Sequence, residues 1–214
     1  MDKKTPLSPK IILASSSIYR QKQLAQFGIS FSSVSPDINE SAYHGETPHD
    51  LAIRLSKQKA ATVAERLARE KNQMEHHHLI IGSDQTAEID NQLLGKPLSY
   101  DNAINQLKLC SGQAVTFYSG LAVLDTKTQQ TYAQAITTAV QFRALNDKDI
   151  HSYIKIDNPI YCAGSFKCES LGISLFDHIH SDDPSALVGL PLIALNKLFL
   201  RFNFNILDNQ IQLA

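Results

Sequence analysis

The feature that most constrains the fold is a short stretch near the start of the chain, in which an apolar run gives way to serines and then to a helical pattern. Residues 11–14 are apolar, Ser15, Ser16 and Ser17 follow, and apolar residues then recur at helical spacing as far as Gly28. This order predicts a buried strand that leads through a hydroxyl-rich turn into a helix. Free backbone N–H groups and the helix dipole favour an anion at such a turn.

Two interpretations of this turn are open. Arg20 lies one turn into the predicted helix, where its fork of donors suits phosphate oxygens. In the alternative, Ser17 serves only as the N-cap of the helix. The segment alone supports both interpretations about equally, so the choice depends on the rest of the chain.

Helical and extended patterns alternate along the remaining sequence. This alternation predicts an α/β fold, in which a mixed, twisted sheet with flanking helices forms two lobes around a central cleft. The two longest extended patterns, residues 114–124 and 131–145, are predicted to form an antiparallel pair. Shorter strands are predicted at residues 31–35, 79–81, 86–89 and 93–94, and further helices at residues 48–67, 100–111, 147–156 and from Pro184 or Pro191 to Phe202.

Composition narrows the class of protein. The 214 residues suffice for one large domain or two lobes, and the net charge of −1 argues against broad, nonspecific binding of nucleic acid. No apolar run has the length of a membrane span, and the start of the chain does not resemble a signal peptide. The odd number of cysteines, without metal-like spacing, favours a reducing compartment. We therefore expect a cytoplasmic protein with neither nucleic acid nor a membrane as partner.

The sequence Ile-Ile-Gly-Ser-Asp-Gln at residues 80–85 places a carboxylate, Asp84, where the predicted strand ends. Proteins of the α/β class tend to bind ligands at such strand ends. Asp84 then has the chemistry to deprotonate a water molecule or to hold a divalent cation. The alternative, an Asx-turn that closes the strand, is the better explanation of this segment taken alone.

Further charged residues are candidates for ligand binding. Lys167 suits a phosphate, and Glu169 suits the N1–H and amino donors of a guanine edge. Without other context, the two form a surface pair of little energetic value. Other candidates, each of which is by itself better explained as a solvated charge, are Glu40, Lys59 and Lys96.

Five short signatures occur in order along the chain. They are Leu-Ala-Ser-Ser-Ser-x-x-Arg at 13–20, Ile-Ile-Gly-Ser-Asp-Gln at 80–85, Gly-Lys-Pro-Leu at 95–98, Cys-Ala-Gly-Ser-Phe-Lys-x-Glu at 162–169 and Asp-Pro-x-x-Leu-x-Gly-Leu-Pro-Leu at 183–192. Together they resemble the Maf family of nucleoside triphosphate pyrophosphatases, within it the YceF-like branch. The resemblance implies a Maf/ITPase-like fold, a single domain over residues 11–207 and polar tails at residues 1–10 and 208–214.

The family implies a hydrolase that cuts between the α- and β-phosphates of a nucleotide with the help of a divalent cation, Mg²⁺ or Mn²⁺. Asp84 matches the general base of the family, and Glu40 and Asp84 are the expected metal contacts. The triphosphate is expected on Ser15, Ser16, Ser17, Arg20, Lys59, Lys96 and Lys167. A homodimer is the assembly we consider.

Base selection is expected, on the same resemblance, at Tyr19, Gln85 and Glu169. The branch that acts on dTTP and UTP usually carries Thr after the Asp, whereas this chain has Gln85, as in the branch associated with 7-methyl-GTP. A methylated guanine ring is positively charged, so an aromatic face and a nearby carboxylate both stabilise it.

The chain departs from the family pattern at three positions. Ile18 and Gln21 stand where members often have Pro and a second Arg, and Asn39 precedes Glu40 where an acidic pair is usual.

Three functions compete: a 7-methyl-GTP pyrophosphatase that releases 7-methyl-GMP and diphosphate, the same chemistry on dTTP or UTP, and a non-catalytic nucleotide-binding regulator of cell division. Gln85 and Glu169 favour the first over the second.

Overall fold

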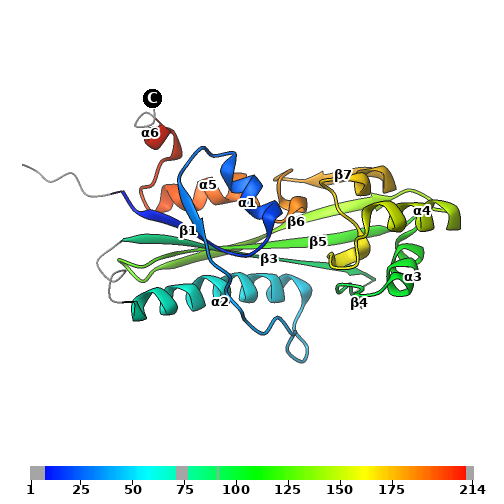
Figure 1. Cartoon of the computed structure of the whole chain (residues 1–214), viewed down its shortest axis with the longest axis horizontal. Helices are drawn as coiled ribbons and strands as arrows, with labels where there is room; N and C mark the ends of the chain where they lie inside the picture. Colours follow the sequence, from blue (N-terminus) through cyan, green and yellow to red (C-terminus); the bar gives the residue numbers. More distant parts are fainter. Residues whose placement is uncertain (1–7, 71–76, 91, 211–214) are drawn as a thin grey trace, which may run out of the picture.

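The structure, a computed structural model, describes residues 8–70, 77–90 and 92–210 (Figure 1). Within these ranges, seven strands form one mixed sheet in the order β2-β1-β3-β5-β6-β7, with β4 paired to β3 outside this path. The strands are β1 (Lys10–Ala14), β2 (Phe31–Ser33), β3 (His78–Ile89), β4 (Gln92–Leu93), β5 (Ala114–Asp125), β6 (Thr131–Phe142) and β7 (Phe176–Ser181). β1 pairs in parallel with β2 and β3, and the other pairs are antiparallel.

Helices flank this sheet on both faces. They are α1 (Ile18–Ala25), α2 (Pro48–Arg69), α3 (Tyr100–Cys110), α4 (Asp147–Asp157), α5 (Leu192–Arg201) and α6 (Ile206–Gln210), with 3-10 turns η1 (Ala163–Ser165), η2 (Leu171–Leu175) and η3 (Ala186–Val188). Figure 1 shows α2 along one face, α1 and α5 on the other, and α3 and α4 at one end. No helix among the described residues is long and apolar enough to cross a membrane. The predicted α/β class with a mixed sheet and flanking helices is confirmed.

The core explains why β1 is apolar without interruption. Ile11 and Leu13 pack with α1 and α5 on one face, whereas Ile12 and Ala14 pack against α2 on the other. Successive side chains of a strand point to opposite faces, so a strand covered on both sides needs apolar residues at every position.

The helix starts follow the capping residues of the sequence. The side chains of Ser17, Thr47 and Ser99 each accept a hydrogen bond from the backbone N–H three residues later, as N-caps do. α5 begins after Pro191, not at Pro184, because the intervening residues form η3 and a turn.

Two glycines bring α2 unusually close to the sheet. A Cβ atom added to Gly82 in β3 would lie 2.0 Å from the carbonyl oxygen of Ser56, and one added to Gly120 in β5 would lie 2.1 Å from that of Ala52. Because no side chain stands between them, the backbone of α2 rests on the strands at these positions. This close approach brings α2 against the stretch of β3 that contains Asp84.

The prediction that a strand ends at Asp84 is wrong, because β3 continues without interruption to Ile89. Ladder pairing with β5 runs through the polar stretch, with Asp84 opposite Gly120. The Ser83 hydroxyl, which is typical of a turn in the sequence, instead donates to the carbonyl oxygens of Gly120 and Gly189. The Asx-turn alternative is therefore also wrong.

Other strands also differ from the predictions: β2 ends at Ser33 and not at Ser35, and β4 covers Gln92–Leu93 and not residues 93–94. β6 ends at Phe142, three residues earlier than expected, and the edge strand β7 was not predicted. The sequence of β7, Phe-Asp-His-Ile-His-Ser, is mostly exposed and polar, so it lacks the apolar alternation that marks a half-buried strand.

Candidate active site

A cleft of about 1430 Å³ opens where β1 ends beside β3. The parallel pairing of these strands stops at Ala14 opposite Gly82, and β3 continues past this point. Asp84 therefore lies mid-strand in β3 and yet beyond the end of its neighbour β1, next to the serine turn. The carboxylate therefore lies at the edge that the sequence predicted, but because β1 ends there and not because β3 does.

All of the residues predicted for the site line this one cleft. They are Ser15, Ser16, Ser17, Tyr19, Arg20, Glu40, Lys59, Asp84, Gln85, Lys96, Lys167 and Glu169. They come from the β1–α1 turn, α1, the loop before α2, α2 itself, β3, the loop before α3 and the segment after η1. Their joint position in the cleft is observed, and their individual roles stay predictions.

A buried ammonium group joins two carboxylates at the floor of the cleft. Nζ of Lys59, from α2, lies 2.6 Å from Oδ1 of Asp84 and 2.6 Å from Oε1 of Glu40. Lys59 is 5% exposed, so it needs such partners in place of water. Lys96 approaches the other oxygen of Glu40 at 3.4 Å.

These ion pairs control the charge of Glu40. Partial burial alone would raise the pKa of its carboxyl, but the hydrogen bonds and charges of Lys59 and Lys96 outweigh this effect and lower the pKa below its ordinary value. Glu40 is therefore ionised at neutral pH.

Asp84 has one oxygen free for chemistry. Its Oδ1 accepts the hydrogen bond from Lys59, whereas Oδ2 has no hydrogen-bond partner among the described residues. Since Asp84 lines the cleft, this second oxygen is available to accept a proton from water or to contact a cation.

The serine turn uses part of its hydrogen-bonding capacity internally. Oγ of Ser17 caps α1, and Oγ of Ser15 accepts from the backbone N–H of Ser17 at 3.1 Å. Ser33 in β2 donates to the carbonyl oxygen of Ser15 at 2.6 Å. Ser17 is thus an N-cap, and the turn also lines the cleft, while phosphate binding by the turn stays a prediction.

Arg20 presents one edge of its guanidinium to the cleft. Its Nε donates to the carbonyl oxygen of Gly189 at 2.8 Å, whereas its two Nη atoms have no hydrogen-bond partner among the described residues. Burial lowers the pKa of Arg20, and the negative charges of Asp84 and Glu40 oppose this effect, so the guanidinium is close enough to sense both carboxylates. The free Nη atoms suit phosphate oxygens.

Gly189 is a site residue that our prediction missed, although it lies within the fifth signature. It has φ +109°, which a side chain rarely tolerates, and its carbonyl accepts from both Arg20 and Ser83. The glycine in Gly-Leu-Pro-Leu was the available signal.

Gln85 is held by its amide nitrogen. Its Nε2 donates to Oγ of Ser119 at 3.0 Å and lies 3.1 Å from the carbonyl oxygens of Ala186 and Leu187. The surrounding acceptors orient the amide so that Oε1, which has no partner among the described residues, is the group left for a ligand. Ser119, a second residue missed from the sequence, lies in an apolar strand pattern that carried no signal.

The far wall of the cleft carries Lys167 and Glu169. Nζ of Lys167 donates to the carbonyl oxygen of Asp157 at the end of α4. No ion pair within 4.0 Å joins Lys167 to Glu169 in the part of the chain that the structure describes, so the predicted alternative of a surface pair is not observed. Partial burial raises the pKa of Glu169.

The cysteines do not offer a nucleophile. All three are free thiols, and Cys162 and Cys168 line the cleft. Burial raises the pKa of Cys162, and that of Cys168 to about 11, which keeps both thiols protonated at neutral pH.

Comparison with known proteins assigns the chain to a family. A family model described as "Maf-like protein" matches residues 10–202, and the chain belongs to this family. A relative named 7-methyl-GTP pyrophosphatase from Saccharophagus degradans is 49% identical over 88% of this chain and 91% of its own length. Another of the same name, from Vibrio cholerae, is 41% identical over 92% and 98%.

Among solved structures, the Ham1 protein of Staphylococcus aureus has a TM-score of 0.39 at 14% identity, over 62% of this chain and 71% of its own.

Proposed function

We propose that this protein is a nucleoside triphosphate pyrophosphatase that hydrolyses 7-methyl-GTP to 7-methyl-GMP and diphosphate. The observation that carries the proposal is the free oxygen of Asp84, in a cleft shared with the serine turn and with the cations Arg20, Lys59 and Lys96. Membership of the Maf family, with relatives of this activity at 41–49% identity, supports the same reaction.

In this reaction Asp84 accepts a proton from the attacking water. The new P–O bond forms at the α-phosphate, the α–β anhydride bond breaks, and the leaving diphosphate carries away the electron pair. Arg20 and Lys96 stabilise the charge that develops on it. Lys59 holds the carboxylate of Asp84 in place through its hydrogen bond to Oδ1.

Glu40 and Asp84 fit a divalent cation as an accessory to the substrate. Within the described residues, no group of three or more His, Cys, Asp or Glu side chains is placed to hold a metal ion. Mg²⁺, however, is commonly bound by one or two carboxylates together with substrate phosphates and water. When bound, the cation would neutralise phosphate charge.

The walls of the cleft suit a methylated guanine. Tyr19 is 37% exposed and offers an aromatic face, and the carboxylate of Glu169 complements a positively charged ring. Oε1 of Gln85 accepts from a base N–H donor, because the amide nitrogen is already engaged.

The test is turnover of a nucleotide panel, measured as phosphate released in the presence of added inorganic pyrophosphatase. We expect strong preference for 7-methyl-GTP over GTP, dTTP and UTP. A preference for dTTP or UTP would place the chain in the other branch of the family. A rise in melting temperature with nucleotide, without any release, would identify the regulatory binder instead.

Two further proposals concern the setting of the protein. The three free thiols support a cytoplasmic location, which cell fractionation tests. A homodimer is proposed as the assembly, and light scattering of the purified chain decides between it and a monomer.

A further inference from the structure

The loop between β2 and α2 carries Glu40 but contains neither helix nor strand among its described residues, 34–47. Such loops are usually mobile unless other groups tie them down. The side chain of Glu40 is 44% exposed, so packing does little to hold it. Something else must fix its carboxylate 2.6 Å from Lys59.

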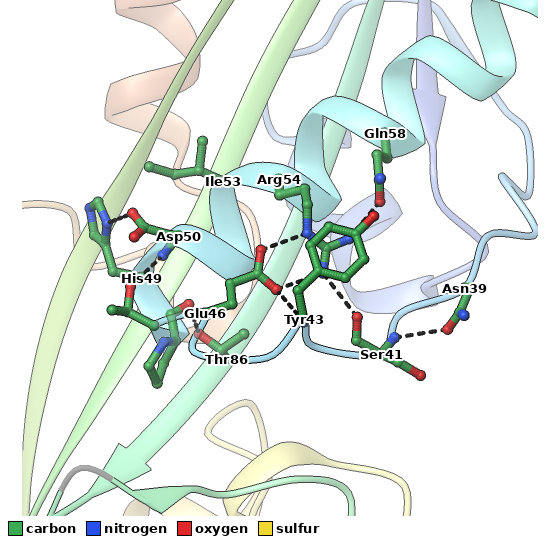
Figure 2. A network of polar contacts seen from close by, with 12 residues as sticks. Asn39, Ser41, Tyr43, Glu46, His49, Asp50, Ile53, Arg54, Gln58 and Thr86 are labelled. Atoms are coloured by element: carbon green, nitrogen blue, oxygen red, sulfur yellow. Dashed lines mark hydrogen bonds and ion pairs between the residues drawn. The ribbon is translucent and has the colours of Figure 1, made fainter.

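Arg54 of α2 binds this loop through Nε and Nη2 of its guanidinium, while Nη1 contacts α2 itself (Figure 2). Its Nε and Nη2 donate to the two carboxylate oxygens of Glu46 at 2.6 and 2.8 Å, a bidentate pair. Nη2 also donates to the carbonyl oxygen of Ser41 at 2.9 Å, and Nη1 to Oε1 of Gln58 at 2.9 Å.

The contacts of Arg54 continue to the residues on either side of Glu40. The guanidinium carbon of Arg54 lies 3.9 Å from the centre of the Tyr43 ring. The backbone N–H of Tyr43 donates to Glu46 at 2.9 Å. The backbone N–H of Ser41 donates to Oδ1 of Asn39 at 2.9 Å, which closes a turn around Glu40. Asn39, a departure from the family pattern, thereby takes part in holding the loop.

This pair differs from an ordinary surface ion pair. The side chains of Arg54 and Glu46 are only 17% and 10% exposed, and each guanidinium nitrogen has a partner. Arg54 also lies on the same helix as Lys59. One helix thus holds both the ammonium group and the loop that brings Glu40 to it.

We propose that Arg54 is a positioning residue that, through Glu46 and the Ser41 carbonyl, holds Glu40 against Lys59 for the reaction. The inference rests on the proposed function, since it assigns Glu40 a part in it. A displacement of about 1 Å at a positioned group can cost on the order of 100-fold in rate. Arg54 itself does not line the cleft and does not touch the substrate.

The first experiment compares Arg54→Lys with Arg69→Lys. The former keeps the charge and loses the fork, and the latter changes an exposed arginine of the same helix whose carboxylate contact, Glu65, is 4.0 Å away. We expect kcat for 7-methyl-GTP to fall roughly 10- to 100-fold in Arg54→Lys and to stay at the parental value in Arg69→Lys. Parental kcat in Arg54→Lys would overturn the inference.

The second experiment separates positioning from general stability by placing Arg54→Lys in a Glu40→Gln background. If Arg54 acts through Glu40, the double variant is no slower than Glu40→Gln alone. Two losses that multiply, or a Glu40→Gln variant as fast as the parent, would overturn the inference.

Hydrogen exchange gives a readout that does not depend on activity. The peptide covering residues 36–47 should exchange faster in Arg54→Lys than in Arg69→Lys, without faster exchange in the sheet. Unchanged exchange of this peptide contradicts the inference. If the parent hydrolyses no nucleotide, the proposed function fails, and the exchange result still decides whether Arg54 holds the loop.

Discussion

At the scale of single residues, the site is organised by one ammonium group. The buried Lys59 compensates two carboxylates whose negative charges would otherwise repel each other. Lys59 binds Oδ1 of Asp84 and thereby holds the carboxylate in place. Oδ2 of the same carboxylate stays open to the cleft, where it can accept a proton.

Asp84→Asn should therefore reduce turnover far more than substrate binding. We expect kcat to fall by about 10²–10⁴, the usual contribution of a general base, with little change in KM. Steady-state kinetics on 7-methyl-GTP provide the measurement, with Asp177→Asn on the exposed strand β7 as the control. A loss smaller than about tenfold would show that Asp84 is not the base.

At the scale of secondary structure elements, the approach of α2 to the sheet sets the geometry of the site. Gly120 pairs with Asp84 across the β3–β5 ladder and also faces the backbone of α2. Because Gly120 has no side chain, α2 can lie directly against the strands. This contact places Lys59 of α2 beside Asp84.

Gly120→Ala should force α2 away from β5, because the new methyl group would lie 2.1 Å from the carbonyl oxygen of Ala52. We expect the free energy of unfolding to fall by about 1–3 kcal/mol or more, as for other overpacked cores. Denaturant unfolding measures it. Gly95→Ala, where nothing lies within 4 Å, is the matched control, and equal stability of both variants would refute the close approach.

The elements differ in how well the sequence predicted them. Strand β1 and the starts of α1, α2 and α3 were predictable, since apolar runs and capping residues act locally. The continuity of β3 was not, because Ser83 and Gln85 find their partners in η3 and the residues beside it, more than 100 positions away. Most residues that line the cleft lie in the signatures, whereas Glu40 and Lys59 lie outside them and were candidates only as charged residues. Their contacts, above all the tie between Arg54 and Glu46, depend on tertiary structure.

At the scale of the whole molecule, the ion pairs of the cleft imply that the fold does not need a metal. Treatment with a chelator should abolish hydrolysis, and added Mg²⁺ or Mn²⁺ should restore it, while the melting temperature stays unchanged. We expect the melting temperature to stay unchanged because Lys59 already neutralises the charge between Glu40 and Asp84 without a metal. Full activity after chelation would remove the metal from the reaction, and a large drop in melting temperature would reveal a structural ion.

Strands β3, β5 and β6 each span twelve residues and are paired along most of their length. Their long ladders form a continuous, rigid part of the sheet that runs from the end at α5 to the end at α3 and α4 (Figure 1). A motion that brought the two ends of the molecule together would have to disrupt the pairing of these strands. Binding of the nucleotide should therefore move loops at the rim of the cleft, such as the segment that bears Lys96, while the long strands keep their positions.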